Sequence, residues 1–220
     1  MEKSMYSLIL IDEVVRKIDE LAHTRGTSRS GLVNQILADH VSFLTPARRV
    51  EEIFEHIASE LRAAGGLQLR QNSPGTLSAK SVLTYRYNPA IRYNVEIAPE
   101  EGQYICRLKV GSRTQSDSLR SRLSMFYEIW SQIEAVTLRK LREDIDSAIN
   151  GERFRRTLQI EKAGALPPGD ILGKAIGAYI RMFDAALKLS FASDHGMDMQ
   201  TYQKIAALYK EHIEHSELRL

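Results

Sequence analysis

The sequence predicts an α+β fold for this chain of 220 residues, and three observations lead to that class. A short strand-like run at the start is followed at once by two helical segments. A middle stretch alternates apolar and polar residues with the period of a β-strand, and most of the remaining chain carries apolar stripes with helical spacing. We therefore expect an N-terminal strand and helix pair, then a small antiparallel sheet with long helices, and a C-terminal helical hairpin.

The first element is a short strand over Ser4–Leu10. A strand of this length has unpaired backbone groups on both edges and is not stable alone in water. No partner strand follows before the two helices, so the simplest partner is the same strand of a second copy. Side chains alternate along a strand, which separates an inward-facing set, Tyr6, Leu8 and Leu10, from an outward-facing set, Met5, Ser7 and Ile9.

Two helices joined by a tight turn follow the strand. The first helix covers 12–22, and Gly26 ends it because glycine adopts the left-handed conformation without steric cost. Ser28 is the expected N-cap of the second helix, where its hydroxyl accepts from a free backbone N–H. The apolar positions that we expect to be buried are Val14, Ile18, Leu21 and Ala22 in the first helix and Leu32, Val33, Ile36, Leu37 and Val41 in the second.

This order of elements, with Gly26 and then Ser28-Arg29-Ser30 between the helices, resembles the ribbon-helix-helix family of DNA-binding proteins, of the Arc, MetJ and CopG type, over residues 4–43. The resemblance implies an intertwined homodimer whose two-stranded β-ribbon enters the major groove of double-stranded DNA. It implies that the base-facing residues are Met5, Ser7 and Ile9. It places a phosphate clamp beside the N-terminus of the second helix, formed by Arg25, Thr27, Ser28, Arg29 and Ser30.

The charge of this module leaves a second interpretation open. Residues 1–44 hold five basic and six acidic residues, a net charge of −1. Phosphate contacts supply most of the non-specific affinity for DNA, so a module of this charge depends on a few well-placed cations. The alternative is a protein-interaction scaffold that uses the ribbon-helix-helix fold only to dimerise.

Residues 45–163 are predicted to form a second, α+β domain. Thr45 suits the N-cap of a helix over 46–64, which begins with a proline and ends at two glycines. A long apolar stripe predicts a further helix over 116–150. The stretch 151–163 suits either a short helix or a strand.

Between these two helices the chain changes to a period of two. Three alternating runs, at 82–87, 91–97 and 103–110, are separated by turn residues and predict an antiparallel meander. One face of this meander is apolar. The other is basic, and it could follow a nucleic-acid backbone, hold an anionic ligand, or serve only as a soluble surface that protects the sheet. This secondary basic face comprises Arg86, Arg92, Arg107 and Lys109.

The last part of the chain, 164–220, is predicted to be a helical hairpin. A linker with the sequence Pro-Pro-Gly precedes a helix over 170–191, and a second helix covers 199–218. Gly173 and Gly177, four residues apart, indicate close helix packing. The hairpin could pack within the chain or form a second oligomer contact.

Several classes of function are disfavoured. The chain has a single cysteine, Cys106, which rules out a disulfide framework and a multi-cysteine zinc site. No apolar run has the length of a membrane span, and the first residues lack the layout of a signal peptide, so we expect a cytoplasmic protein. Motifs for nucleotide or acyl-transfer chemistry do not occur. His212 and His215 on one helix are better explained as a solvated surface than as metal ligands.

The sequence therefore predicts no enzymatic activity, no cofactor and no metal. It favours a cytoplasmic, homodimeric DNA-binding protein, a prokaryotic transcriptional regulator of the repressor type. The C-terminal region would then oligomerise, sense a ligand or bind a partner protein.

Overall fold

The computed structural model describes residues 5, 7–41, 45–73, 75–100, 103–139, 146–158, 160, 167–192, 197–218 and 220. The chain divides into two compact units, Met1–Arg48 and Arg49–Leu220. We call them the N-terminal unit and the C-terminal unit. Each has its own apolar cluster, and each is described by itself below.

The N-terminal unit contains two helices, α1 (Asp12–Thr24) and α2 (Arg29–His40). Gly26 lies between them with a φ of 61°, and the N–H of Thr27 donates to the Ala22 carbonyl at 2.9 Å. This pattern closes α1 in the way that a C′ glycine usually does. The Ser28 hydroxyl accepts from the Gly31 N–H at 3.1 Å and caps α2. The predicted helix stop and N-cap are both confirmed.

The predicted N-terminal ribbon is not seen. Of the stretch Ser4–Leu10, Ser4 and Tyr6 lie outside the described residues, and the rest form no strand. The physical reason is that a strand needs a hydrogen-bonded neighbour, and a single chain offers this stretch none.

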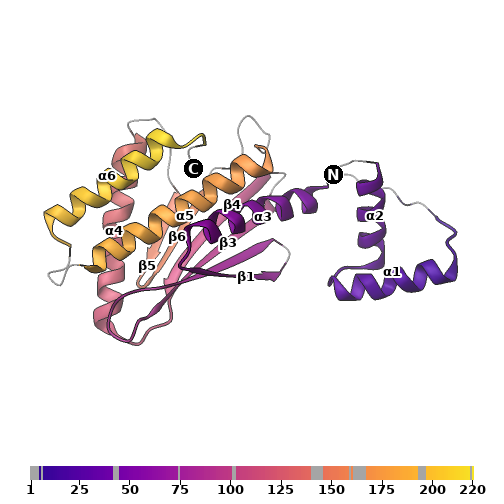
Figure 1. Cartoon of the computed structure of the whole chain (residues 1–220), viewed down its shortest axis with the longest axis horizontal. Coiled ribbons are helices and arrows are strands. Elements are labelled where there is room, and N and C mark those ends of the chain that lie inside the picture. The colour runs from indigo at the N-terminus through magenta and orange to yellow at the C-terminus, as the bar shows by residue number, and fades with distance from the viewer. Residues whose placement is uncertain are drawn as a thin grey trace. The chain divides into compact units, whose positions relative to one another are not determined.

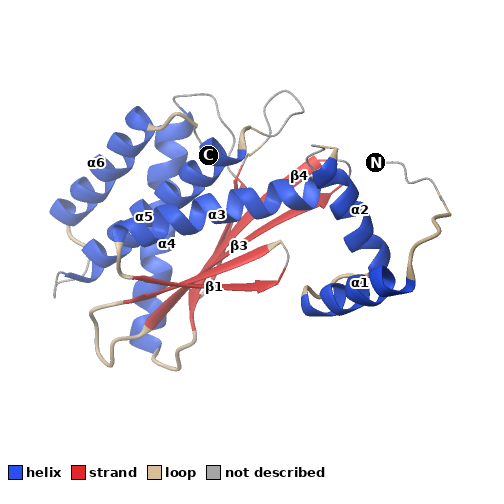
Figure 2. Ribbon diagram, turned by 45° about the vertical axis from the view of Figure 1, so that its right-hand side comes forward, coloured by secondary structure: helices blue, strands red, loops and turns tan. Residues whose placement is uncertain are grey.

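The C-terminal unit is built on a six-stranded antiparallel sheet with the order β1-β2-β3-β4-β6-β5. The helices of the unit lie over one face of this sheet (Figures 1 and 2). The strands are β1 (Leu67–Ser73), β2 (Thr76–Val82), β3 (Ala90–Glu100), β4 (Gln103–Ser112), β5 (Asp146–Asn150) and β6 (Arg153–Leu158), and the helices are α3 (Pro46–Ala64), α4 (Asp117–Arg139), α5 (Gly169–Ala192) and α6 (Met199–His215). The register shifts in β1 between Gln71 and Ser73.

The core lies between the sheet and its helices. The inward side chains of β3 and β4 are buried there, as the alternation predicts, among them Tyr93, Val95, Leu108 and Val110. The Tyr93 hydroxyl donates to Asp184 of α5 at 2.8 Å, which fixes the helix over the middle of the sheet. Cys106 is also buried, and burial raises the pKa of its thiol to about 12. Cys106 is therefore a residue of the core.

Two predicted elements of this unit are wrong. The run 82–87 is not a strand beyond Val82, because Tyr87 and Asn88 adopt positive φ angles of 63° and 44° in a turn. The helix predicted over 116–150 ends at Arg139 in the described chain, and 146–150 form β5 instead. Gly151, the residue after that stretch, has a φ of 55° in the turn between β5 and β6. Of the two structures that suited the residues after it, the strand is the one that forms over β6.

The remaining helices agree with the sequence. The N–H of Arg48 donates to the Thr45 hydroxyl at 3.2 Å, so Thr45 caps α3. The predicted close packing of α5 is confirmed, since a Cβ on Gly173 would lie 2.7 Å from the Ile53 carbonyl of α3. The helices α5 and α6 contact each other and contribute to the same core as the sheet. Within the described chain, no helix combines the length and the apolar character that crossing a membrane requires.

Candidate nucleic-acid interface

The turn between α1 and α2 holds the residues of the predicted phosphate clamp. Arg25 is the C-cap of α1, and Thr27, Ser28 and Ser30 surround the start of α2. All of these side chains are exposed. The packing here is close, since a Cβ on Gly31 would lie 2.9 Å from the Thr27 hydroxyl. The first turn of α2 therefore presents its backbone at the surface, with a cation just before it.

Arg29, one of the residues of the predicted clamp, forms an ion pair within the N-terminal unit. Its guanidinium donates through Nε and Nη2 to both carboxylate oxygens of Asp19, at 2.6 and 2.5 Å. The hydrogen bond from Arg29 lowers the pKa of Asp19. Both side chains remain more than 40% exposed, at 59% for Arg29 and 44% for Asp19. Arg29 therefore links α2 to α1. Of the two arginines at this turn, Arg25 is the one that forms no ion pair with a described residue.

The N-terminal unit exposes a large part of its apolar residues. Its buried cluster consists of Ile18, Ala22 and Leu32, with Val33 partly buried beside it. The predicted burial of several other positions is wrong for the single chain. The side chains concerned are exposed by 42% at Val14, 45% at Leu21 and Ile36, 52% at Leu37 and 69% at Val41.

The residues predicted to face the bases are also exposed. Met5 is 96% and Ile9 is 103% exposed, and Ser7 is exposed as well. Two residues of the predicted inward set are only partly covered, with Leu8 61% and Leu10 42% exposed. In one chain, the described residues of both sets therefore face solvent.

The secondary basic face lies mainly where the alternation places it. Arg92 of β3 and Arg107 and Lys109 of β4 are on the face of the sheet opposite the helices of this unit, whereas Arg86 is in the turn after β2. Four further cations lie on this face and were not predicted from the sequence. They are Arg70, Lys80, Arg153 and Arg155. The alternation of Arg153-Phe154-Arg155 was the signal that could have found two of them.

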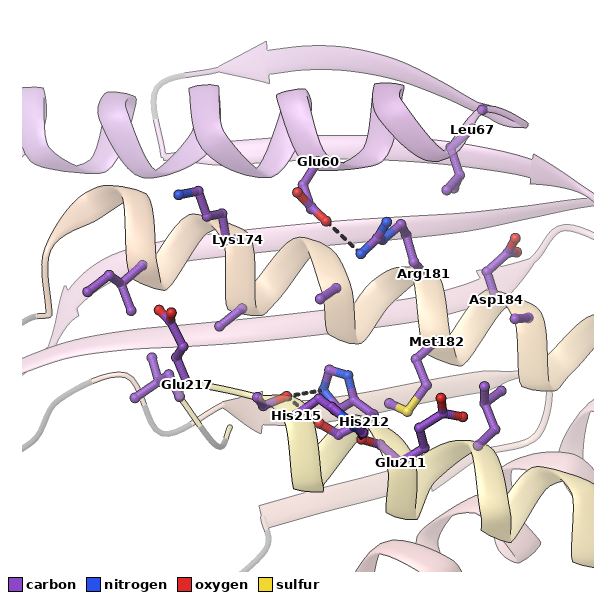
Figure 3. Close-up of a pocket in the computed structure, with 18 of the residues that line it drawn as sticks. Glu60, Leu67, Lys174, Arg181, Met182, Asp184, Glu211, His212, His215 and Glu217 are labelled. Atoms are coloured by element: carbon purple, nitrogen blue, oxygen red, sulfur yellow. Dashed lines mark hydrogen bonds and ion pairs between the residues drawn. The ribbon is translucent and has the colours of Figure 1, made fainter.

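A hollow of about 880 Å³ lies on the helical side of the C-terminal unit (Figure 3). Glu60 of α3 and Arg181 of α5 form an ion pair across it, at 2.6 Å. His212 and His215 of α6 also line it. The His215 ring bonds the Glu211 carbonyl at 2.8 Å, and the His212 ring lies 3.3 Å from the Ser216 hydroxyl. Among the described residues, no group of three or more His, Cys, Asp or Glu side chains could hold a metal ion.

Compared with models of protein families, with curated proteins and with solved structures, the chain gives no match.

Proposed function

We propose that this protein is a homodimeric DNA-binding protein, a prokaryotic transcriptional regulator of the repressor type. In this proposal the N-terminal unit dimerises, and the two copies of Ser4–Leu10 pair into a β-ribbon that enters the major groove. The observation that carries the proposal is the apolar surface left exposed on a small unit. A unit of this size with three buried apolar residues in its cluster does not bury enough surface to be stable alone.

A second copy is the occupant that fits this surface. The exposed apolar residues include Ile36 and Leu37 of α2, its C-cap Val41, and Leu8 and Leu10 of the N-terminal stretch. A twofold dimer buries the same patch of both subunits, and homodimer interfaces are more apolar than other protein surfaces. The same pairing would give the N-terminal stretch the hydrogen-bonded neighbour that it lacks in one chain.

The turn supplies the contact to DNA in this proposal. Arg25 is exposed beside the N-terminus of α2, where free N–H groups and the helix dipole favour a phosphate. A dimer would carry two such turns, one from each subunit. Met5, Ser7 and Ile9 would meet the groove, where Ser7 can donate and accept hydrogen bonds and the apolar pair can contact thymine methyl groups.

A second candidate function is a scaffold that uses this unit only to dimerise. The pairing of Arg29 with Asp19 favours it, because that pairing takes one of the few cations of the unit away from phosphate binding. This candidate predicts an intact dimer and no binding of DNA.

The dimer is tested by light scattering of the full chain after size-exclusion chromatography. We expect the unchanged protein to elute as a dimer and Leu37→Lys to elute as a monomer, because a charge would be buried in the interface. The matched control is Val136→Lys, since Val136 on α4 is 55% exposed against 52% for Leu37. A monomeric unchanged protein, or a dimer that persists in Leu37→Lys, would contradict the proposal.

DNA binding is tested by fluorescence anisotropy with a mixed-sequence duplex across a salt series. We expect Arg25→Ala to weaken binding and to reduce the slope of log K against log salt by about 2, one contact from each subunit. The control is Arg16→Ala, which removes the same charge from α1 about two and a half turns earlier. Equal effects of the two variants would contradict the phosphate clamp, and a dimer that binds no DNA would establish the scaffold.

A further inference from the structure

The face of the sheet that the helices of the C-terminal unit leave open carries two rows of cations. The strand register defines both rows across all six strands. The first row is Gln68, Lys80, Arg92, Gly111, Arg153 and Asn150, and the second row is Arg70, Ser78, Asn94, Lys109, Arg155 and Ala148. Six of these twelve positions are basic, and neither row contains an acidic residue. We call these two rows the basic sheet face.

The acidic residues of this side lie in the next row. There Glu96 of β3 and Asp146 of β5 are at the level of Arg107 and Thr157. Glu96 binds Lys109 at 2.7 Å, and Asp146 accepts from the Thr157 hydroxyl at 2.6 Å. The other five cations of the two rows form no ion pair with a described residue. They are Arg70, Lys80, Arg92, Arg153 and Arg155, all of them exposed.

The register sets like charges against each other. Lys80 of β2 is directly opposite Arg92 of β3, and such a pair is unfavourable in a sheet. Gly111 of β4 follows Arg92 in the same row. A Cβ at Gly111 would lie 3.1 Å from the Glu152 carbonyl, a tight contact, and 3.4 Å from Cγ of Arg153, so the backbone just before Arg153 comes close to β4 here. A glycine within a strand often marks a place where a ligand or another backbone comes close.

The surface above these rows is hollowed. A depression of about 1150 Å³ is lined by residues of both rows, together with Arg113 just after β4. With neighbouring strands about 4.8 Å apart, the six strands span about 24 Å. A DNA duplex carries about 14 phosphates over that length. The size and charge therefore suit a polyanion better than a small anionic ligand.

We propose that the basic sheet face binds the phosphate backbone of a nucleic-acid duplex without reading its sequence. Four of its six cations are arginines, whose planar guanidinium groups can each form two parallel hydrogen bonds to a phosphate. Gln68, Asn94 and Asn150 add neutral amides between them. No aromatic side chain occurs in either row, whereas single-strand binding surfaces stack bases on aromatic rings. A second copy of the same face would be repelled.

This surface belongs to the C-terminal unit and does not depend on the proposed role of the N-terminal unit. If both bind, it would supply the non-specific affinity that a module with a net charge of −1 provides poorly.

The test uses the full chain and a labelled random-sequence duplex of about 30 base pairs, followed by anisotropy between about 50 and 200 mM salt. The face variant is Arg92→Gln/Arg153→Gln/Arg155→Gln. The matched control is Arg62→Gln/Arg139→Gln/Lys204→Gln, which removes the same charge from exposed positions on α3, α4 and α6. A third variant replaces the same three face arginines with lysine.

We expect the face variant to lose about tenfold in affinity and to reduce the salt slope by two to three, the number expected for about three lost phosphate contacts. The control should change affinity by less than the face variant at every salt concentration. The lysine variant should recover most of the binding, since it keeps the charge, and thermal melts followed by circular dichroism verify that all variants are folded. Equal losses in the face variant and the control, or no loss in the face variant, would overturn the proposal.

Two further measurements distinguish a duplex from a single strand and from a lipid surface. Tighter binding to a single strand of the same length, abolished in the face variant, would overturn the assignment to a duplex. So would binding to phosphatidylserine vesicles without binding to the duplex. The Arg25→Ala variant makes the two proposals separable. Loss in the face variant alone supports the basic sheet face and contradicts the clamp, and loss in Arg25→Ala alone does the reverse.

Discussion

Glu134 of α4 and Arg156 of β6 form an ion pair in the core of the C-terminal unit. Nε of Arg156 lies 3.3 Å from Oε2 of Glu134, and the two side chains are 1% and 0% exposed. The Tyr179 hydroxyl donates to Glu134 at 2.7 Å, and Nη2 of Arg156 donates to the main-chain oxygen of Leu220 at 2.9 Å. Burial raises the pKa of Glu134, although the charge of Arg156 opposes the shift. The pair is therefore held at a high desolvation cost.

Removing one partner of this pair should destabilise the protein strongly. We expect Arg156→Met to lower the free energy of unfolding by about 3–5 kcal/mol, because it leaves a buried carboxylate without its counter-charge. The double variant Glu134→Leu/Arg156→Met should recover most of the loss, since it leaves neither charge buried. Urea denaturation of the single variants and the double variant measures this coupling. Additive losses in the double variant would show that the two side chains do not act as a pair.

The stability should also depend on pH through His212. Burial, with a smaller effect of Arg181, lowers the pKa of His212 from its ordinary value of 6.5. The unfolded chain then binds a proton more readily than the folded one. The stability that the neutral His212 side chain contributes is therefore complete above pH 6.5. It is lost as the pH falls through the lower pKa that His212 has in the folded protein.

The measurement is urea denaturation at a series of pH values from about 7.5 down to 5, on both sides of the ordinary histidine pKa. We expect His212→Gln to flatten the decline in stability on the acid side. His215→Gln, at the exposed end of the same helix, is the control and should leave the decline unchanged. A decline of the same size in His212→Gln and in the unchanged protein would assign it to other groups.

The contact between Asp19 and Arg29 can be followed at the carboxylate. We expect Arg29→Ala to raise the pKa of Asp19 toward its ordinary value of 3.8, because the hydrogen bond from Arg29 is the largest cause of its lowering. Arg29→Lys should restore the shift in part, since lysine keeps the charge and loses the bidentate geometry. Carboxyl chemical shifts in an NMR titration report both values. An unchanged Asp19 pKa in Arg29→Ala would mean that the contact does not form in solution.

The crossing of α3 and α5 depends on the absence of a side chain at Gly173. A Cβ there would lie 2.5 Å from Cβ of His56 and 2.7 Å from the Ile53 carbonyl. We expect Gly173→Ala to lower the free energy of unfolding by about 1–3 kcal/mol, because the two helices would have to separate.

The control for this variant is Gly169→Ala in the first turn of α5. Its Cβ would meet the carboxyl end of Glu52, which can move aside at little cost. Thermal melting of both variants compares them. Equal melting temperatures would show that the crossing has room to adjust.

The helices were predictable because their signals are local. Thr45 caps α3, Gly26 ends α1 and Ser28 caps α2 as the residue types indicate. The strands β1, β2 and β5 were missed because each has few large apolar side chains on its inward face. In β6 the pattern is further obscured by Arg156, which faces the core and reads as a surface residue.

The sequence predicted where the residues of the turn between α1 and α2 lie, but it did not predict the contact that Arg29 makes. The sequence places Arg29 at the turn, but its contact with Asp19 joins residues ten apart on two helices and has no signature in a short window. The basic sheet face is assembled from all six strands, and its cations come from five of them, β1, β2, β3, β4 and β6. Only the strand register places Arg92 and Arg153 in one row. The register cannot be derived when each strand of the sequence is considered separately.

The two borders of the sheet bear on whether copies of this protein aggregate at high concentration. Exposed strand borders are templates on which other chains can add and form fibrous aggregates. Here one border is β5, with five residues, and the other is β1, whose register shifts between Gln71 and Ser73. Neither border offers a long, regular row of free amides. A strand of another chain could therefore form few continuous hydrogen bonds at either border, which disfavours aggregation through the sheet.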